Sequence, residues 1–138
     1  MRFLRRVSEL LCCIVVGFCG YVGIEMLFRG YSYRLMGVLG AIAFCVIGQF
    51  NNKKNIGLFW QGLLGSLLIT FMELASGILL LRNGIRMWDY SEQLWNYRGL
   101  ICPLFSFLWF LLSIAVALFD DYLRNKLFGE EKKHYTFL

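Results

Sequence analysis

The sequence predicts an all-α fold, a four-helix transmembrane bundle with an aromatic, interfacial loop between the third and fourth helices. Three observations support this prediction. The chain has 138 residues, of which 59% are hydrophobic, and its mean hydropathy is +0.61. Its apolar residues form four long runs, which a soluble domain of this size could not bury. A long polar and aromatic segment, residues 82–99, separates the last two runs.

Each apolar run can cross a bilayer as a helix. A hydrocarbon core about 30 Å thick needs about 20 helical residues. The expected spans are residues 10–27, 31–50, 58–81 and 100–119. The apolar part of the second run begins only at Leu35, so that span includes Tyr31 to Arg34. Because the spans use nearly the whole chain, we expect a single integral membrane domain over residues 1–138.

The first run has an alternative interpretation as a signal peptide, because Arg2, Arg5 and Arg6 precede its apolar core. Apolar residues continue from Gly20 to Phe28, beyond the usual length of such a core. No A-x-A-like cleavage site interrupts them. We therefore expect this run to remain as a membrane anchor.

Basic residues in the short loops predict the orientation of the chain. With four spans, the side that holds both termini has nine basic residues: Arg2, Arg5, Arg6, Lys53, Lys54, Arg124, Lys126, Lys132 and Lys133. The other side has five: Arg29, Arg34, Arg82, Arg86 and Arg98. This excess predicts cytoplasmic termini and an external aromatic loop. Because the basic residues are dispersed around the membrane ends, they argue against nucleic acid as a partner.

The residues able to bind metals are scattered. The five cysteines are Cys12, Cys13, Cys19, Cys45 and Cys102, and they form no C-x-x-C motif. His134 lies alone in the charged tail, and adjacent helical residues such as Asp120 and Asp121 point about 100° apart. We therefore expect no metal site and no cofactor, and we interpret the two aspartates as interfacial caps paired with Arg124 or Lys126.

Small and polar residues mark the helix faces that should pack together. In the third span Gly62, Ser66, Thr70, Glu73 and Gly77 recur at spacings of three and four, which places them on one face. The second span carries Gly37 and Gly40. Such residues let helices approach closely in membranes, so packing within the bundle is the simplest interpretation of the glycines.

Glu73 is the residue that packing alone does not explain. It lies about 12 Å below the outer end of its helix, well inside the hydrocarbon. A charge at that depth costs on the order of 2.5 to 3.5 kcal/mol, so it should be paired, neutralised or hydrated. Glu25 could bring a second carboxyl to this level, with Arg29, Arg34 and Arg82 as partners.

This arrangement has two interpretations. Two converging acids would suit a proton-coupled or cation-binding site. The structural alternative is an interhelical salt bridge, or a carboxyl hydrogen-bonded to serine or threonine.

The aromatic loop should lie along the membrane surface, because the rings of Trp88, Tyr90, Trp95 and Tyr97 favour the headgroup level. Shorter side chains that can cap local turns stand among them: Asp89, Ser91 and Asn96. Residues 91–94 could form a single helical turn. The loop is therefore either an aromatic belt or a lid above Glu73 that contacts a ligand.

Several of these residues also form a recognisable pattern: Thr70 and Glu73 in TFMELASGILL, WDYS at 88–91, Asn96, Gly99, Ile101-Cys102, Trp109, LFDDYLR at 118–124, and Glu25 with RGYS at 29–32. The pattern resembles small bacterial membrane proteins known as ABC transporter type IV, or CmpB-like permeases. The resemblance runs from about Gly20 to Phe128. It departs at Trp95, where phenylalanine is common, and at Tyr97-Arg98, which replaces a more apolar pair.

The resemblance implies a transport-related protein in the bacterial cytoplasmic membrane, either a permease-like subunit or a small solute-binding bundle with a buried carboxylate centre under the external loop. Such a bundle would contact membrane lipid and assemble as a homo-oligomer or with other membrane subunits, and a separate ATPase could supply energy. The alternative is a non-catalytic accessory protein that binds another membrane protein or a lipid. We do not expect an enzyme, because no nucleophile and base stand at a recognisable spacing and no H-E-x-x-H motif is present.

Overall fold

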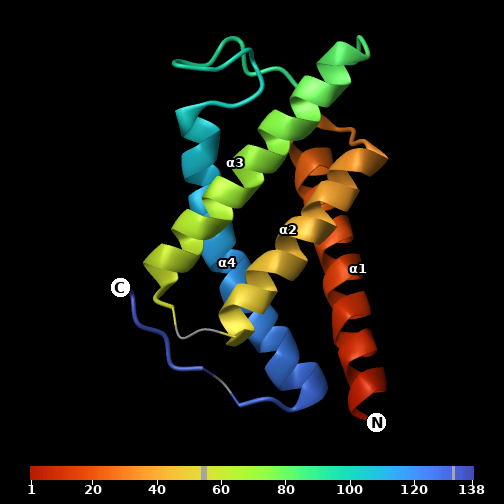
Figure 1. Cartoon of the computed structure of the whole chain (residues 1–138), viewed down its shortest axis with the longest axis vertical. Helices are drawn as coiled ribbons and strands as arrows, with labels where there is room; N and C mark the ends of the chain where they lie inside the picture. The colour runs from red at the N-terminus through yellow and green to blue at the C-terminus, as the bar shows by residue number, and fades with distance from the viewer. Residues whose placement is uncertain (54–55, 132) are drawn as a thin grey trace.

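The computed structural model describes residues 1–53, 56–131 and 133–138, and only the backbone of residues 51–53. Four helices follow one another along the chain: α1 (Arg2–Arg29), α2 (Arg34–Lys53), α3 (Leu58–Arg82) and α4 (Pro103–Phe128) (Figure 1). Within the described residues the only β pairing is an isolated bridge between Tyr97 and Ile101. The all-α prediction is therefore confirmed.

The exterior of the bundle suits lipid. By length and composition, α1, α3 and α4 can each cross a membrane, and residues 34–50 of α2 form a shorter apolar helix. Large apolar side chains face outward on the long helices, among them Val15, Leu67, Phe71 and Leu111. A bundle whose helices are apolar on their outer as well as their inner faces belongs in a membrane.

The helices differ from the expected spans mainly at their ends. Tyr31 to Tyr33 lie outside α2, which begins at Arg34. α4 begins at Pro103, as the fixed φ of proline and its missing amide hydrogen favour. α1 and α4 continue through charged turns, to Arg2 and to Phe128. Hydropathy does not detect such turns, because a charged residue can extend a helix beyond the hydrocarbon.

Close backbone contact joins α1 to α2. A Cβ atom built on Gly17 would lie 2.7 Å from the carbonyl oxygen of Gly40, and one built on Gly40 would lie 2.8 Å from that of Gly17. Only glycine allows these two backbones to touch. Gly37 faces the Phe18 ring of α1 in the same way. Gly37 and Gly40 therefore pack within the chain.

The small and polar face of α3 lies against α4 and the segment before it. Ser66 donates a hydrogen bond to the Ser106 carbonyl oxygen at 2.6 Å, and the hydroxyls of Thr70 and Ser106 are 3.0 Å apart. Gly62 faces Phe110 and Ile114, and Gly77 faces Leu100. This face of α3 thus takes part in helix packing inside the chain.

The two ends of the bundle differ. In Figure 1 the loop between α3 and α4 lies at the top, and the N-terminus lies at the bottom. The C-terminal segment runs back to the start of α3, where the amides of Leu58 and Phe59 donate to the carbonyl oxygens of Thr136 and Phe137 at 2.9 and 2.8 Å. This pairing supplies acceptors that the first turn of a helix otherwise lacks.

Candidate functional site

Glu73 lies in the interior of the bundle, with only 3% of its surface exposed. Its Oε1 accepts a hydrogen bond from the Tyr90 hydroxyl at 3.1 Å, and its Oε2 accepts one from Trp109 Nε1 at 3.0 Å. The carboxyl therefore connects three parts of the fold: α3, the α3–α4 loop (residues 83–102) and α4. Its partners are aromatic donors, neither the serine or threonine nor the salt bridge of the structural alternative.

Ring packing positions the two donors. The rings of Tyr90 and Phe105 stack with centroids 4.2 Å apart, and the Trp109 ring stacks on Tyr21 of α1 at 5.9 Å. Each ring is therefore held by a neighbouring ring as well as by its hydrogen bond to Glu73. Loss of the carboxyl would leave both donors buried and without their acceptor.

Glu25 forms a second link to the loop. It is 5% exposed and accepts hydrogen bonds from Arg29 at 2.7 Å and from Ser32 at 2.8 Å. Arg29 also donates to the Met87 carbonyl oxygen at 3.2 Å. Glu25 thus positions the Arg29 guanidinium, which in turn binds the loop. This is the pairing of Glu25 with Arg29 that the sequence predicted.

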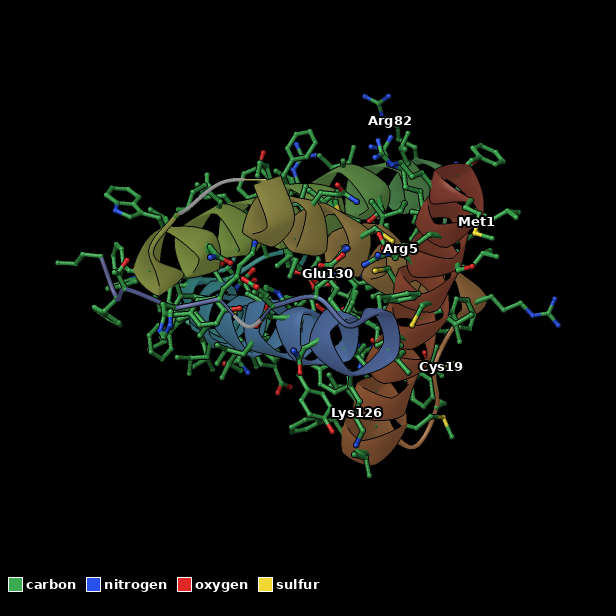
Figure 2. The ribbon with its side chains drawn as sticks, turned by 90° about the horizontal axis from the view of Figure 1, so that it is seen from below. Met1, Arg5, Cys19, Arg82, Lys126 and Glu130 are labelled. Carbon is green, nitrogen blue, oxygen red and sulfur yellow. The ribbon has the colours of Figure 1, made fainter. Side chains whose placement is uncertain are left out.

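The two acids share no hydrogen-bond donor in the part of the chain that the structure describes. Tyr21 of α1 stacks on Trp109, the ring that donates to Glu73. Arg34 has no ion pair with either acid among the described residues, and its side chain is exposed. Arg82 projects away from the bundle in Figure 2. Of the three expected arginine partners, the structure brings only Arg29 to the acids.

The loop is folded against the bundle. Trp88 and Tyr90 are buried, whereas Trp95 and Tyr97 are exposed. Trp88 Nε1 donates to the Leu100 carbonyl oxygen at 3.0 Å, and the Tyr90 amide donates to that of Gly99 at 2.8 Å. Two of the four aromatic residues expected at the headgroup level are therefore core residues of the bundle mouth.

Short polar side chains hold the loop together, as predicted. Asp89 Oδ1 accepts from the Ser91 amide at 2.9 Å. Asn96 donates to the carbonyl oxygens of Ser91 and Gln93 and accepts from the Gly99 amide. Residues 91–94 form turns and a bend, not the expected helical turn, and the Asn96 side chain bonds two carbonyl oxygens of this stretch.

Asp89 should make the loop sensitive to strong acid. The hydrogen bond from the Ser91 amide, with help from the Arg86 guanidinium, lowers the pKa of Asp89. The stabilisation from a lowered carboxyl pKa is complete above the ordinary value of about 3.9 and is lost as the pH falls through the lower folded value. We expect the NMR signal of the Ser91 amide to be constant above about pH 4 and to shift only below it. Asp89→Asn should abolish that shift. A midpoint above the ordinary aspartate value would contradict this prediction.

A second polar cluster lies at the opposite end of the bundle. Arg124 pairs with Asp120 at 2.9 Å and with Glu9 of α1 at 3.3 Å. Arg5 pairs with Glu9 and with Glu130, and in Figure 2 the labelled Arg5 and Glu130 lie near each other between α1 and the C-terminal segment. We call these five residues the terminal-side charge cluster.

The charge cluster confirms one sequence prediction and corrects another. Asp120 pairs with Arg124, as expected from their spacing of four. Asp120 is only 1% exposed, however, so it is a buried residue and not an interfacial cap. Cys13 Sγ also lies 3.7 Å from its Oδ1. The contacts made by α1 had no signal in the sequence, because Glu9 and Arg124 are 115 positions apart.

Comparison with known proteins adds one finding. A family model described as "Putative ABC-transporter type IV" matches residues 7–137. The match includes Glu25, Glu73, the α3–α4 loop and the cluster residues Glu9, Asp120 and Arg124. No curated protein and no solved structure matches the chain significantly.

Proposed function

The chain belongs to the ABC-transporter type IV family, and from this premise we propose that it is a permease-like membrane subunit whose α3–α4 loop acts as the outer gate. Family membership confirms the resemblance seen in the sequence and makes the chain an ABC-transporter-related membrane protein. The observation that supports a gate is the pair of buried acids that hold the loop. Glu73 accepts a hydrogen bond from Tyr90 of the loop. Glu25 pairs with Arg29, which in turn donates to the Met87 carbonyl oxygen of the loop.

A packing role alone gives no reason for acids at these positions. An apolar side chain would fill the same space without the cost of a polar group inside a bilayer. Hydrogen bonds to a buried carboxylate are strong, yet they can be exchanged for bonds to a proton or a cationic solute. In the proposed role, such an exchange at Glu73 releases Tyr90, and the loop then leaves the bundle mouth.

The proposed role involves no bond chemistry and places the protein in a larger assembly. We infer that the bundle resides in the bacterial cytoplasmic membrane with both termini in the cytoplasm. Further membrane subunits or copies of this chain would complete a pathway, and a separate ATPase would supply the energy. The excess of basic residues on the side of the termini supports this orientation.

Cys102 offers a direct test of the gate. It is the last residue of the loop, packs with Met36, Trp88 and Tyr90 at the bundle mouth, and is 3% exposed. In a chain with Cys12, Cys19 and Cys45 changed to alanine and Cys13 to serine, a membrane-impermeant maleimide added on the loop side should label Cys102 slowly. Tyr90→Phe and Glu73→Leu should each raise the labelling rate about tenfold, because a hydrogen bond to a charged group contributes about 1.5–3 kcal/mol.

Tyr97→Phe is the matched control, since it removes a hydroxyl from an exposed tyrosine of the same loop. It should leave the rate unchanged. An equal rate for Tyr90→Phe and the control would overturn the gate. In cells where deletion of the protein alters uptake or export of a solute, Glu73→Gln should alter it too. Faster labelling with unchanged transport would refute the permease role while retaining the loop contact.

The alternative of an accessory protein that docks through glycine-lined faces receives less support. Gly40 packs against Tyr21 and Gly77 against Leu100, both inside the chain. Leucine at either position would disturb the fold before it affected a partner. An accessory role therefore needs a different contact surface.

A further inference from the structure

An apolar groove runs along the bundle between α1, α2 and α4. Its volume is about 230 Å³, and its lining includes Gly17, Tyr21, Phe44, Leu112 and Val116. Gly20 and Ala115 also line it and are exposed, so the groove opens toward the outside of the bundle. Within a membrane, an opening of this kind faces lipid tails.

A polar cavity lies at the terminal-side end of the same three helices. Its volume is about 400 Å³, and it is lined by Arg6, Glu9, Leu10, Cys13, Cys45, Gln49 and Arg124. Part of the charge cluster therefore forms its wall. The charged lining distinguishes this cavity from the apolar groove.

The groove and the cavity follow one another along the bundle axis. On α1, Cys13 lines the cavity and Gly17, one turn further, lines the groove. Residues four apart lie on the same face of a helix, so on α1 the two spaces share a face. On α4, Arg124 in the cavity lies five residues, more than one turn, beyond Phe119 in the groove. The apolar and polar spaces thus follow one another along the bundle, with the polar part nearest the termini.

Among the charged residues that line the cavity, Arg6 is the one available to bind an anion. Arg124 is neutralised by Asp120 and Glu9, and Glu9 also pairs with Arg5. Arg6 has no ion pair in the described part of the chain, although its side chain reaches the cavity lining. An exposed arginine at a membrane boundary attracts anionic headgroups.

We propose that this face binds one anionic phospholipid from the leaflet on the side of the termini. An acyl chain occupies the groove, and the phosphate lies in the polar cavity against Arg6. A phospholipid accounts for both spaces, because its acyl chain is apolar and its headgroup is polar and charged, whereas an apolar helix from a second copy would suit only the groove. The proposal does not depend on the gate.

Native mass spectrometry of the full chain in detergent tests the headgroup contact. Titration with dioleoyl-phosphatidylglycerol should give one tightly bound lipid per chain, and dioleoyl-phosphatidylcholine should bind more weakly. Arg6→Gln should weaken phosphatidylglycerol binding about fivefold. Arg2→Gln is the matched control, because Arg2 lies on the same helix outside the cavity.

Two glycines of α1 provide a matched pair for the groove. A Cβ on Gly20 or on Gly23 would meet no atom within 4 Å, so neither substitution crowds the helix packing. Only Gly20 lines the groove. Gly20→Leu should therefore reduce lipid binding at least about tenfold, whereas Gly23→Leu should not. Ala115→Leu, on the α4 side of the groove, should repeat the loss.

Four results would overturn the proposal. The first two are equal lipid binding by Arg6→Gln and Arg2→Gln, and equal lipid binding by Gly20→Leu and Gly23→Leu. The third is the binding of several equivalent lipids with no preferred first one. The fourth is full competition by inorganic phosphate, which would show an anion site without the groove. Circular dichroism of each variant establishes that its helices are intact. The thermal shift on adding phosphatidylglycerol provides a second measurement, which should be smaller for Arg6→Gln than for Arg2→Gln.

Discussion

Replacing Glu73 with leucine is expected to lower the free energy of unfolding by about 2 kcal/mol. The substitution leaves the Tyr90 hydroxyl and the Trp109 N–H buried without an acceptor. Each orphaned donor costs about 1–3 kcal/mol. Measured hydrogen bonds between membrane helices average only about 0.6 kcal/mol, because the unfolded chain in the membrane also finds partners. We therefore expect the low end of the range at each donor.

Reversible unfolding in mixed micelles, followed by tryptophan fluorescence, measures this effect. Glu73→Gln is the matched control, since an amide of the same shape can bond both aromatic partners and should lose less than about 1.5 kcal/mol. In the Glu73→Leu chain, the further change Tyr90→Phe should recover about 1 kcal/mol, because it removes one orphaned hydroxyl. Equal losses for the leucine and glutamine variants would show that the two hydrogen bonds contribute nothing measurable.

The sequence predicted the interior position of Glu73 but not its partners. The small residues at spacings of three and four gave α3 a packing face, and Glu73 lies on it. Its contact with Trp109 spans 36 positions. Such a contact depends on how α3 and α4 cross, and no local pattern encodes that crossing.

The loop sequence contained a pattern that indicates burial of Trp88 and Tyr90. Trp88 and Tyr90 are buried while Asp89 between them is exposed, which is the alternation of an extended segment with one face inward. An aromatic pair two residues apart beside a buried acid therefore pointed to a segment docked on the bundle. The headgroup preference of tryptophan and tyrosine instead predicted that all four aromatic residues lie at the surface. Among these four, only Trp95 and Tyr97 are exposed.

The charge cluster marks the point where sequence reasoning fails for a physical reason. Hydropathy treats Arg2 to Glu9 and Asp120 to Arg124 as the polar ends of apolar spans, so it assigns them to water. In the structure α1 and α4 continue as helices through these residues and pair their charges. The spacing of four predicted the bond within α4 but could not predict the contact with Glu9.

Replacing Arg124 with methionine should have the second large effect, a loss of about 3–5 kcal/mol in the free energy of unfolding. Removing one partner of a buried ion pair leaves the other charge uncompensated, which is what makes such losses large. Here Asp120, at 1% exposure, loses its guanidinium, and Glu9 loses one of its two arginines. Adding Asp120→Asn should recover most of the loss, because the neutral amide no longer needs a cation.

Lys126→Met is the matched control for that measurement. Lys126 lies in the same last turns of α4, but its ammonium contacts the hydroxyl and the ring of the exposed Tyr122 and points away from the bundle (Figure 2). Exposed contacts of this kind contribute little, so the control should change stability by less than about 1 kcal/mol. The double variant separates two explanations of a large Arg124→Met loss. If Asp120→Asn restores nothing, the loss comes from the packing of the arginine stem, and the charge cluster does not join α1 to α4.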